Sequence, residues 1–84
     1  MKINDFRDLT DSISDAIASV KSAATPDERA IEAERLGRLT DELESALGET
    51  KLKPGHRDAV RAARLLIAAR GLVVECLSVH KEPV

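Results

Sequence analysis

Residues 54–79 read PGHRDAVRAARLLIAARGLVVECLSV, and this stretch predicts a helix that is apolar around most of its circumference. When the residues are placed at about 100° per step, one narrow stripe collects Arg57, Arg61, Arg64, Gly71 and Glu75. Apolar side chains fill most of the remaining arc. A helix that is apolar nearly all round is normally a buried one. We therefore expect the rest of the chain, a second copy or a partner to surround it.

The composition indicates one small folded domain spanning residues 1–84. Hydrophobic residues make up 43% of the chain and charged residues 33%, which is typical of a folded domain and too apolar for a disordered one. At this length a single core is marginal, so a partner or a second copy would add substantially to stability. Phe6 is the only aromatic residue. The core must therefore be aliphatic, and the stacking platforms of single-stranded nucleic-acid binders are missing.

Several features predict a cytoplasmic protein that does not contact a membrane. Cys76 is the only cysteine, so it cannot form an internal disulfide. The first eight residues, MKINDFRD, lack the basic start and apolar run of a signal peptide. Charged residues also interrupt the apolar stretch 54–79, at Arg64, Arg70 and Glu75, so it is too broken to span a bilayer.

Two further helices precede residues 54–79. In residues 4–24, apolar side chains recur at steps of three and four, which indicates a helix with one apolar face; they are Phe6, Leu9, Ile13, Ile17, Val20 and Ala24. Thr25, Pro26 and Glu28 then combine an N-cap, a proline at the first helical position and a capping-box acid. They predict a tight turn into a second helix.

The second helix is expected over residues 26–47, with an apolar stripe formed by Leu36, Leu39, Leu43, Ala46 and Leu47. Gly48 stands where a left-handed C-terminal cap belongs. The third helix follows over residues 54–79, and we expect the tail, residues 80–84, to fray. This pattern predicts an all-α fold. Its expected architecture is an up-down-up three-helix bundle, with a short turn between the first two helices and the third helix central and most apolar.

A basic stripe at the start of the third helix allows two interpretations. Three aligned arginines with a basic lead-in are typical of a weak phosphate-binding ridge, which makes a small nucleic-acid-binding protein an alternative function; these residues are Lys51, Lys53, Arg57, Arg61 and Arg64. The other interpretation is pairing within the chain. Residues 1–49 hold twelve acids and six bases, and residues 50–84 hold three acids and seven bases. In an up-down-up bundle, three acids of the first helix lie level with the arginines: Asp8, Asp11 and Asp15. The net charge of −2 also opposes attraction to nucleic acid.

No residues assemble into a pattern typical of catalysis or of metal or cofactor binding. Cys76 and His80 are one helical turn apart, but two ligands do not make a structural zinc site, and His56 lies at the other end of the helix. The serines of the first helix have no histidine nearby in the sequence, and the four glycines are scattered. We therefore predict a protein that is not an enzyme and binds no metal or cofactor. Cys76 is expected to be a small core residue.

The excess apolar surface of the third helix predicts protein–protein interaction. The expected partner-binding face comprises Val60, Ile67, Arg70, Val74 and Leu77. Arg70 stands within the apolar arc, so it either reaches solvent, pairs with an acid of its own chain, or meets a carboxylate of another chain. The leading hypothesis is a small adaptor or regulator that uses this face to form a homodimer or another homo-oligomer, or to bind a client.

One resemblance suggests a further alternative. The second half of the chain, from Leu43 through a polar turn to Ala63-Arg64-Leu65-Leu66 and Leu77, resembles the helical hairpins of small co-chaperones of type III secretion needles. The resemblance lies in length and hairpin pattern, includes no diagnostic motif and gives the first helix no place. It implies a secretion co-chaperone-like hairpin protein.

Overall fold

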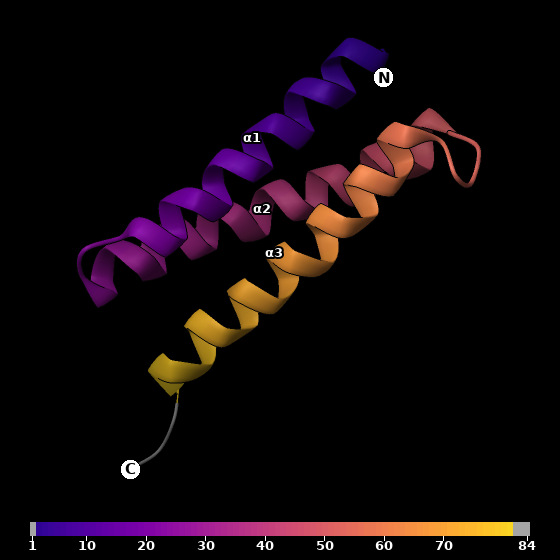
Figure 1. Ribbon diagram of the computed structural model, residues 1–84. Coiled ribbons are helices and arrows are strands. Elements are labelled where there is room, and N and C mark those ends of the chain that lie inside the picture. Colours follow the sequence, from indigo (N-terminus) through magenta and orange to yellow (C-terminus); the bar gives the residue numbers. More distant parts are fainter. Residues whose placement is uncertain (1, 82–84) are drawn as a thin grey trace.

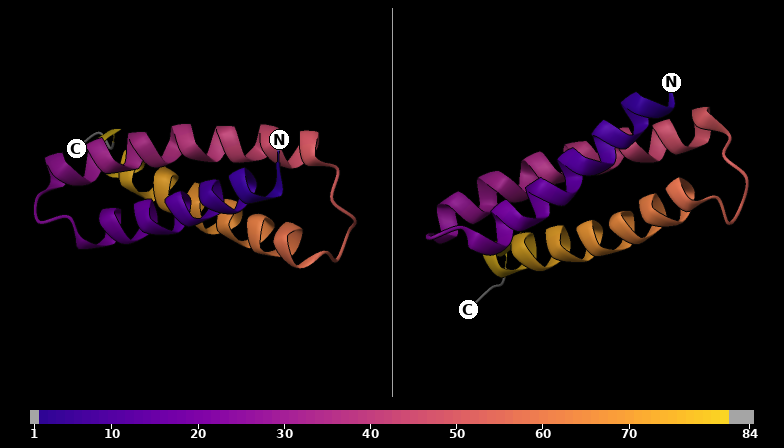
Figure 2. Two further views of the ribbon diagram at one scale, coloured as in Figure 1. Left: turned by 90° about the horizontal axis from the view of Figure 1, so that it is seen from above. Right: turned by 45° about the horizontal axis from the view of Figure 1, so that its top comes forward.

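The fold consists of three packed helices. A computed structural model describes the backbone of residues 2–81 and the side chains of residues 2–76. Its elements are α1 (Ile3–Ser22), α2 (Pro26–Thr50) and α3 (Arg57–Lys81), and the described residues contain no strand. The predicted all-α fold is confirmed. As Figures 1 and 2 show, α2 runs back along α1 and α3 runs back along α2, in a molecule of 46 × 21 × 16 Å.

The turn between α1 and α2 is held by a cap at Thr25. Its Oγ1 atom accepts a hydrogen bond from the backbone N–H of Glu28, at 3.1 Å. Glu28 Oε2 in turn accepts from the backbone N–H of Ala24, at 3.2 Å, one residue earlier than in the usual capping box. One unpaired backbone donor in the first turn of α2, the N–H of Glu28, and one in the preceding turn, the N–H of Ala24, are thus satisfied. The predicted Thr25 cap and tight turn are present, and α1 ends at Ser22 instead of residue 24.

The loop between α2 and α3 differs from the expectation at both ends. Helix α2 continues through Gly48 to Thr50, so the prediction of a cap at Gly48 is wrong; the left-handed residue is Lys51, with φ of 52°. Nothing in Glu49 or Thr50 stops a helix, whereas the residue before Pro54 is forced toward an extended backbone.

Helix α3 begins at Arg57, three residues later than expected, because Gly55 adopts φ of 88° and turns the chain first. At the other end α3 extends to Lys81. The tail that was expected to fray, residues 80–84, lies beyond the described side chains, and residues 82–84 lie outside the described residues altogether.

Helix α2, and not α3, is the central element. It packs along both α1 and α3, whereas α1 and α3 contact each other less. The core takes one face from each helix; its buried apolar side chains in the described residues are Phe6, Ile13, Ala16, Val20, Ala33, Leu36, Leu43, Ala46, Ala62, Leu66, Ala69 and Cys76. The prediction of a central third helix is therefore wrong. Short connections join α2 to both neighbours, and α2 offers each of them a side of its apolar stripe.

Two threonines and one glycine lie where the helices pack against one another. Thr10 and Thr40 are buried, and each hydroxyl donates to the carbonyl three residues earlier, at 2.7 Å, so neither buries an unpaired polar group. A Cβ atom added at Gly37 would meet Val73 Cγ1 of α3 at 3.9 Å. This is an ordinary van der Waals distance, so α3 packs against α2 at Gly37 with room for a methyl group. Within the described residues, no helix carries a stretch long and apolar enough to cross a bilayer.

Candidate interaction surface

Helix α3 presents a row of exposed apolar side chains outside the face that packs on the other helices, and at one end of this row Val74 also borders a hollow shared with α2. Val60, Ile67 and Val74 are exposed by 39%, 75% and 64% respectively, and we call these three residues the outer stripe. They stand seven residues apart, so they drift by only about 20° per step around the helix and form one line. Single exposed apolar residues are ordinary on protein surfaces, but a row at heptad spacing is typical of a helix-packing seam.

The opposite side of α3 explains why the outer stripe is exposed. Asp58, Ala62, Leu66, Ala69 and Cys76 are buried there against α1 and α2. Two helices on one side of α3 cannot also cover its other side. We expected other helices to surround α3, but α1 and α2 cover only one side of it. The apolar arc of α3 therefore extends onto the surface.

Of the other residues predicted for partner binding, Arg70 is also exposed and Leu77 is outside the described side chains. Arg70 forms an ion pair with Glu44 of α2, and about half of each side chain remains accessible. This contact draws the guanidinium toward α2 and away from the outer stripe. Of the roles considered for Arg70, the structure therefore shows pairing with an acid of its own chain.

The basic stripe is only partly neutralised within the chain. Arg61 Nη2 donates to Asp11 Oδ1 of α1 at 2.8 Å, as the parallel course of α1 and α3 predicts. Arg57 and Arg64 form no ion pair among the described residues, and together with Val60 they border a shallow hollow of about 580 Å³ on α3. Lys51 and Lys53 are exposed on the preceding loop. The three arginines proposed for nucleic-acid binding thus line one hollow, and an acid engages one of them.

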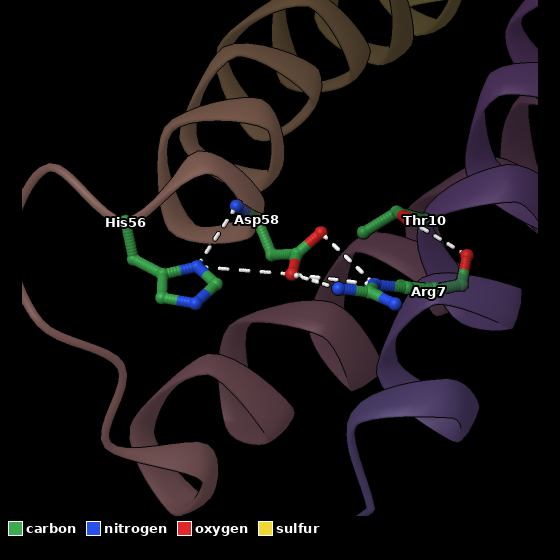
Figure 3. A network of polar contacts seen from close by, with 4 residues as sticks. All are labelled: Arg7, Thr10, His56 and Asp58. Carbon is green, nitrogen blue, oxygen red and sulfur yellow. Dashed lines mark hydrogen bonds and ion pairs between the residues drawn. The ribbon is translucent and has the colours of Figure 1, made fainter.

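A polar cluster that the sequence analysis missed joins the N-terminal part of α1 to the first turn of α3 (Figure 3). Arg7 Nε lies 3.3 Å from both carboxylate oxygens of Asp58, and Arg7 Nη2 donates to Asp58 Oδ2 at 3.1 Å. The backbone N–H of Asp58 donates to His56 Nδ1 at 3.1 Å, so the imidazole caps α3. Because that nitrogen acts as an acceptor, the 3.7 Å approach of His56 Nδ1 to Asp58 Oδ2 is not an ion pair in this arrangement.

The charge environment of Asp58 favours its ionised form. The hydrogen bonds from Arg7 lower the pKa of the Asp58 carboxyl, and burial of the carboxyl opposes them by raising that pKa. The same contact raises the pKa of Arg7. An acid in the first turn also suits the positive end of the α3 dipole. The cluster therefore ties α1 to α3.

One signal in the sequence does indicate this cluster. Asp58 precedes Ala62 by four residues, so it lies on the face of α3 that packs into the core, where a carboxylate requires a partner. The partner was harder to identify because Arg7 belongs to the acidic half of the chain and Asp58 to the basic half. In the Arg7–Asp58 pair the base comes from the acidic half and the acid from the basic half. In the pairs of Arg61 and Arg70 the base comes from the basic half, as the charge asymmetry predicts.

Cys76 is a buried free thiol, as expected for a small core residue. His80, the possible second ligand, lies outside the described side chains. Among the residues whose side chains are described, no group of three or more histidine, cysteine, aspartate or glutamate side chains is placed to hold a metal ion. Comparisons of the chain with known protein families, with curated proteins and with solved structures found no match.

Proposed function

We propose that this chain is a small cytoplasmic protein–protein interaction module, an adaptor or regulator without enzymatic activity, that binds another helix along the outer stripe of α3. The observation that supports this proposal most directly is the exposure of Val60, Ile67 and Val74 in one line, with Ile67 three-quarters exposed. Branched apolar side chains at seven-residue spacing match helix-against-helix recognition. Water contact with such a row is unfavourable, and burial of each side chain releases free energy in proportion to the apolar area covered.

The two alternatives have less support. Nucleic-acid binding would need Arg57, Arg61 and Arg64 to act together, but Asp11 already neutralises Arg61. The net charge of −2 also opposes attraction to a phosphate backbone. The co-chaperone-like hairpin leaves no place for α1, which packs along α2 and contributes Phe6, Ile13 and Val20 to the core.

Site-specific photo-cross-linking tests the proposal. A photoreactive amino acid is placed at Ile67, in the middle of the outer stripe, and in a control variant at Ser14, which is exposed on α1. On irradiation in the cells that make the protein, we expect adducts from position 67 that Val74→Glu abolishes. The mass of an adduct identifies a second copy or a different protein. Absence of adducts at position 67, or the same adducts from position 14, would refute the proposal.

A further inference from the structure

The outer stripe is symmetric about its centre. Val60 lies seven residues before Ile67 and Val74 lies seven residues after it, so the order of side chains is the same in both directions. Two copies of α3 that run antiparallel, with Ile67 of each at a two-fold axis, therefore place Val60 of one copy against Val74 of the other, twice. We propose that the outer stripe binds a second copy of this chain in this antiparallel arrangement. This proposal rests on the function proposed above and names the partner.

The charges on α3 favour the antiparallel over the parallel arrangement. A parallel pair would set the basic half of α3, with Arg57, Arg61 and Arg64, level with the basic half of the second copy, and it would leave Glu75 level only with Glu75. The antiparallel pair instead sets this basic half of α3 against the half that carries Glu75. At the register centred on Ile67, Arg57 lies within about 3 Å, along the helix axis, of the level of Glu75 in the second copy. The helix dipoles also oppose each other favourably in this arrangement.

Arg57 and Glu75 cannot pair with each other within one copy. They lie on the same flank of α3, but they are separated by about 27 Å along the axis. Both are exposed, and neither forms an ion pair among the described residues. Lys21 and Arg29 border the same hollow as Glu75 without approaching it to ion-pair distance. An antiparallel second copy supplies each of the two charges with a counter-charge.

Gly71 provides an independent observation. It lies inside α3, where glycine costs about 1 kcal/mol relative to alanine, and a Cβ atom added to it would meet nothing within 4 Å. Its own chain therefore gives no reason for a glycine there. Gly71 lies about 40° from Ile67 around the helix, on the same side as Arg64. In the antiparallel pair it lies next to Arg64 of the second copy, and the missing side chain leaves space for that guanidinium.

The expected interface is small. The outer stripe extends over about 21 Å of helix, so one pair of α3 helices buries less than a standard protein–protein interface, and we expect a weak dimer with a dissociation constant of roughly micromolar or above. Sedimentation with interference optics suits the measurement because the chain has no tryptophan or tyrosine.

Charge exchange tests the arrangement. Arg57→Glu alone and Glu75→Arg alone each place like charges together at both ends of the interface, so each is expected to weaken the dimer roughly tenfold. The double variant Arg57→Glu/Glu75→Arg restores opposite charges and is expected to regain wild-type association. A double variant that associates no better than the single variants would overturn the antiparallel pairing. Circular dichroism of each variant checks that the helices are intact.

Disulfide trapping provides a second readout that does not depend on charge. In a Cys76→Ala background, a mixture of Val60→Cys and Val74→Cys proteins is expected to form a mixed disulfide, because these positions face each other across the antiparallel pair. Either variant alone should form none, since Val60 of one copy lies about 21 Å from Val60 of the other. A disulfide formed by Val60→Cys alone would overturn the arrangement in favour of a parallel pair.

The two proposals fail in different ways. A wild-type protein that remains monomeric, while Ile67 cross-links to a different protein in cells, would overturn the second copy as partner and leave the interaction function standing. A monomeric protein without any cross-link at Ile67 would overturn both.

Discussion

Two isoleucines, each in the interior of a helix, provide the sharpest test of where the core ends and the interaction surface begins. Ile13 of α1 is fully buried, and Ile67 of α3 is 75% exposed. Replacement of either residue by alanine removes the same atoms from a helix. The two variants therefore differ only in the surroundings of the side chain.

The expected losses differ by several kcal/mol. Truncation of a fully buried isoleucine costs about 2–5 kcal/mol, because the transfer energy is lost and a cavity remains. At Ile67 only a quarter of the side chain is covered, so the loss of transfer energy is about 0.4–0.8 kcal/mol. Alanine is the better helix former by about 0.4 kcal/mol, which offsets most of this loss. Ile67→Ala should therefore leave the free energy of unfolding within about 0.5 kcal/mol of the wild type.

Urea denaturation followed by far-UV circular dichroism measures both losses. The experiment is done at low protein concentration, so that association does not add to the stability of the folded state. Repetition at high concentration is expected to reveal an added stability in the wild type that Ile67→Ala reduces. Equal losses for Ile13→Ala and Ile67→Ala at low concentration would refute the placement of the outer stripe on the surface.

Three further predictions concern the turns and the polar cluster. Gly48→Ala should raise the melting temperature by about 4–8 °C, because a helix with open space at this position favours alanine over glycine by about 1 kcal/mol. Gly55→Ala should lower the melting temperature, because φ at Gly55 is 88°. A rise for both variants would contradict the assigned loop. Thr25→Ala should cost about 1 kcal/mol in urea denaturation through loss of the α2 cap, and an unchanged midpoint would show that the cap contributes nothing. Because the pKa of Asp58 is lowered in the folded state, its charge stabilises the fold above the ordinary pKa of aspartate, and this stabilisation is lost as the pH falls below about 4. The difference in unfolding free energy between the wild type and Asp58→Asn should therefore shrink between about pH 5 and pH 3. A difference that stays constant over this range would refute the role of the charge.

The sequence was most informative where local rules determine the outcome. The recurrence of Phe6, Ile13 and Val20 predicts the buried face of α1, and Thr25 predicts the start of α2, because both depend on neighbours within a few residues. Gly48 was misassigned for a related reason. A glycine can end a helix, but it ends one only where the following residues cannot continue it, and here the helix extends to Thr50.

Tertiary relations were less predictable. The apolar circumference of α3 suggested a central helix, yet α2 is central because it is joined to both neighbours by short connections. The burial of Thr10 and Thr40 was missed because their hydroxyl groups are satisfied by their own helices and then behave as small core residues. The contact of Arg7 with Asp58 joins residues far apart in the sequence. It also pairs a base of the acidic half with an acid of the basic half, which the charge asymmetry does not predict.

The structure places four of the five predicted partner-binding residues. Val60, Ile67 and Val74 are exposed in one line, and their role in partner binding stays a prediction. Arg70 is exposed beside them but is engaged by Glu44, and the side chain of Leu77 lies outside the described residues. The periodicity of one helix predicts which residues share a side. It does not predict which side the other helices leave uncovered.

Molar mass by light scattering, over a hundredfold range of protein concentration, tests self-association through the outer stripe most directly. For the wild type we predict a mass that rises with concentration from the 9.1 kDa of one chain toward twice that value. For Val74→Glu we predict a helical protein that keeps the mass of one chain throughout, because a charge then stands against Val60 in both of the apolar contacts that flank Ile67. A wild-type mass that stays at 9.1 kDa at every concentration, or a Val74→Glu protein that associates as strongly as the wild type, would contradict the account.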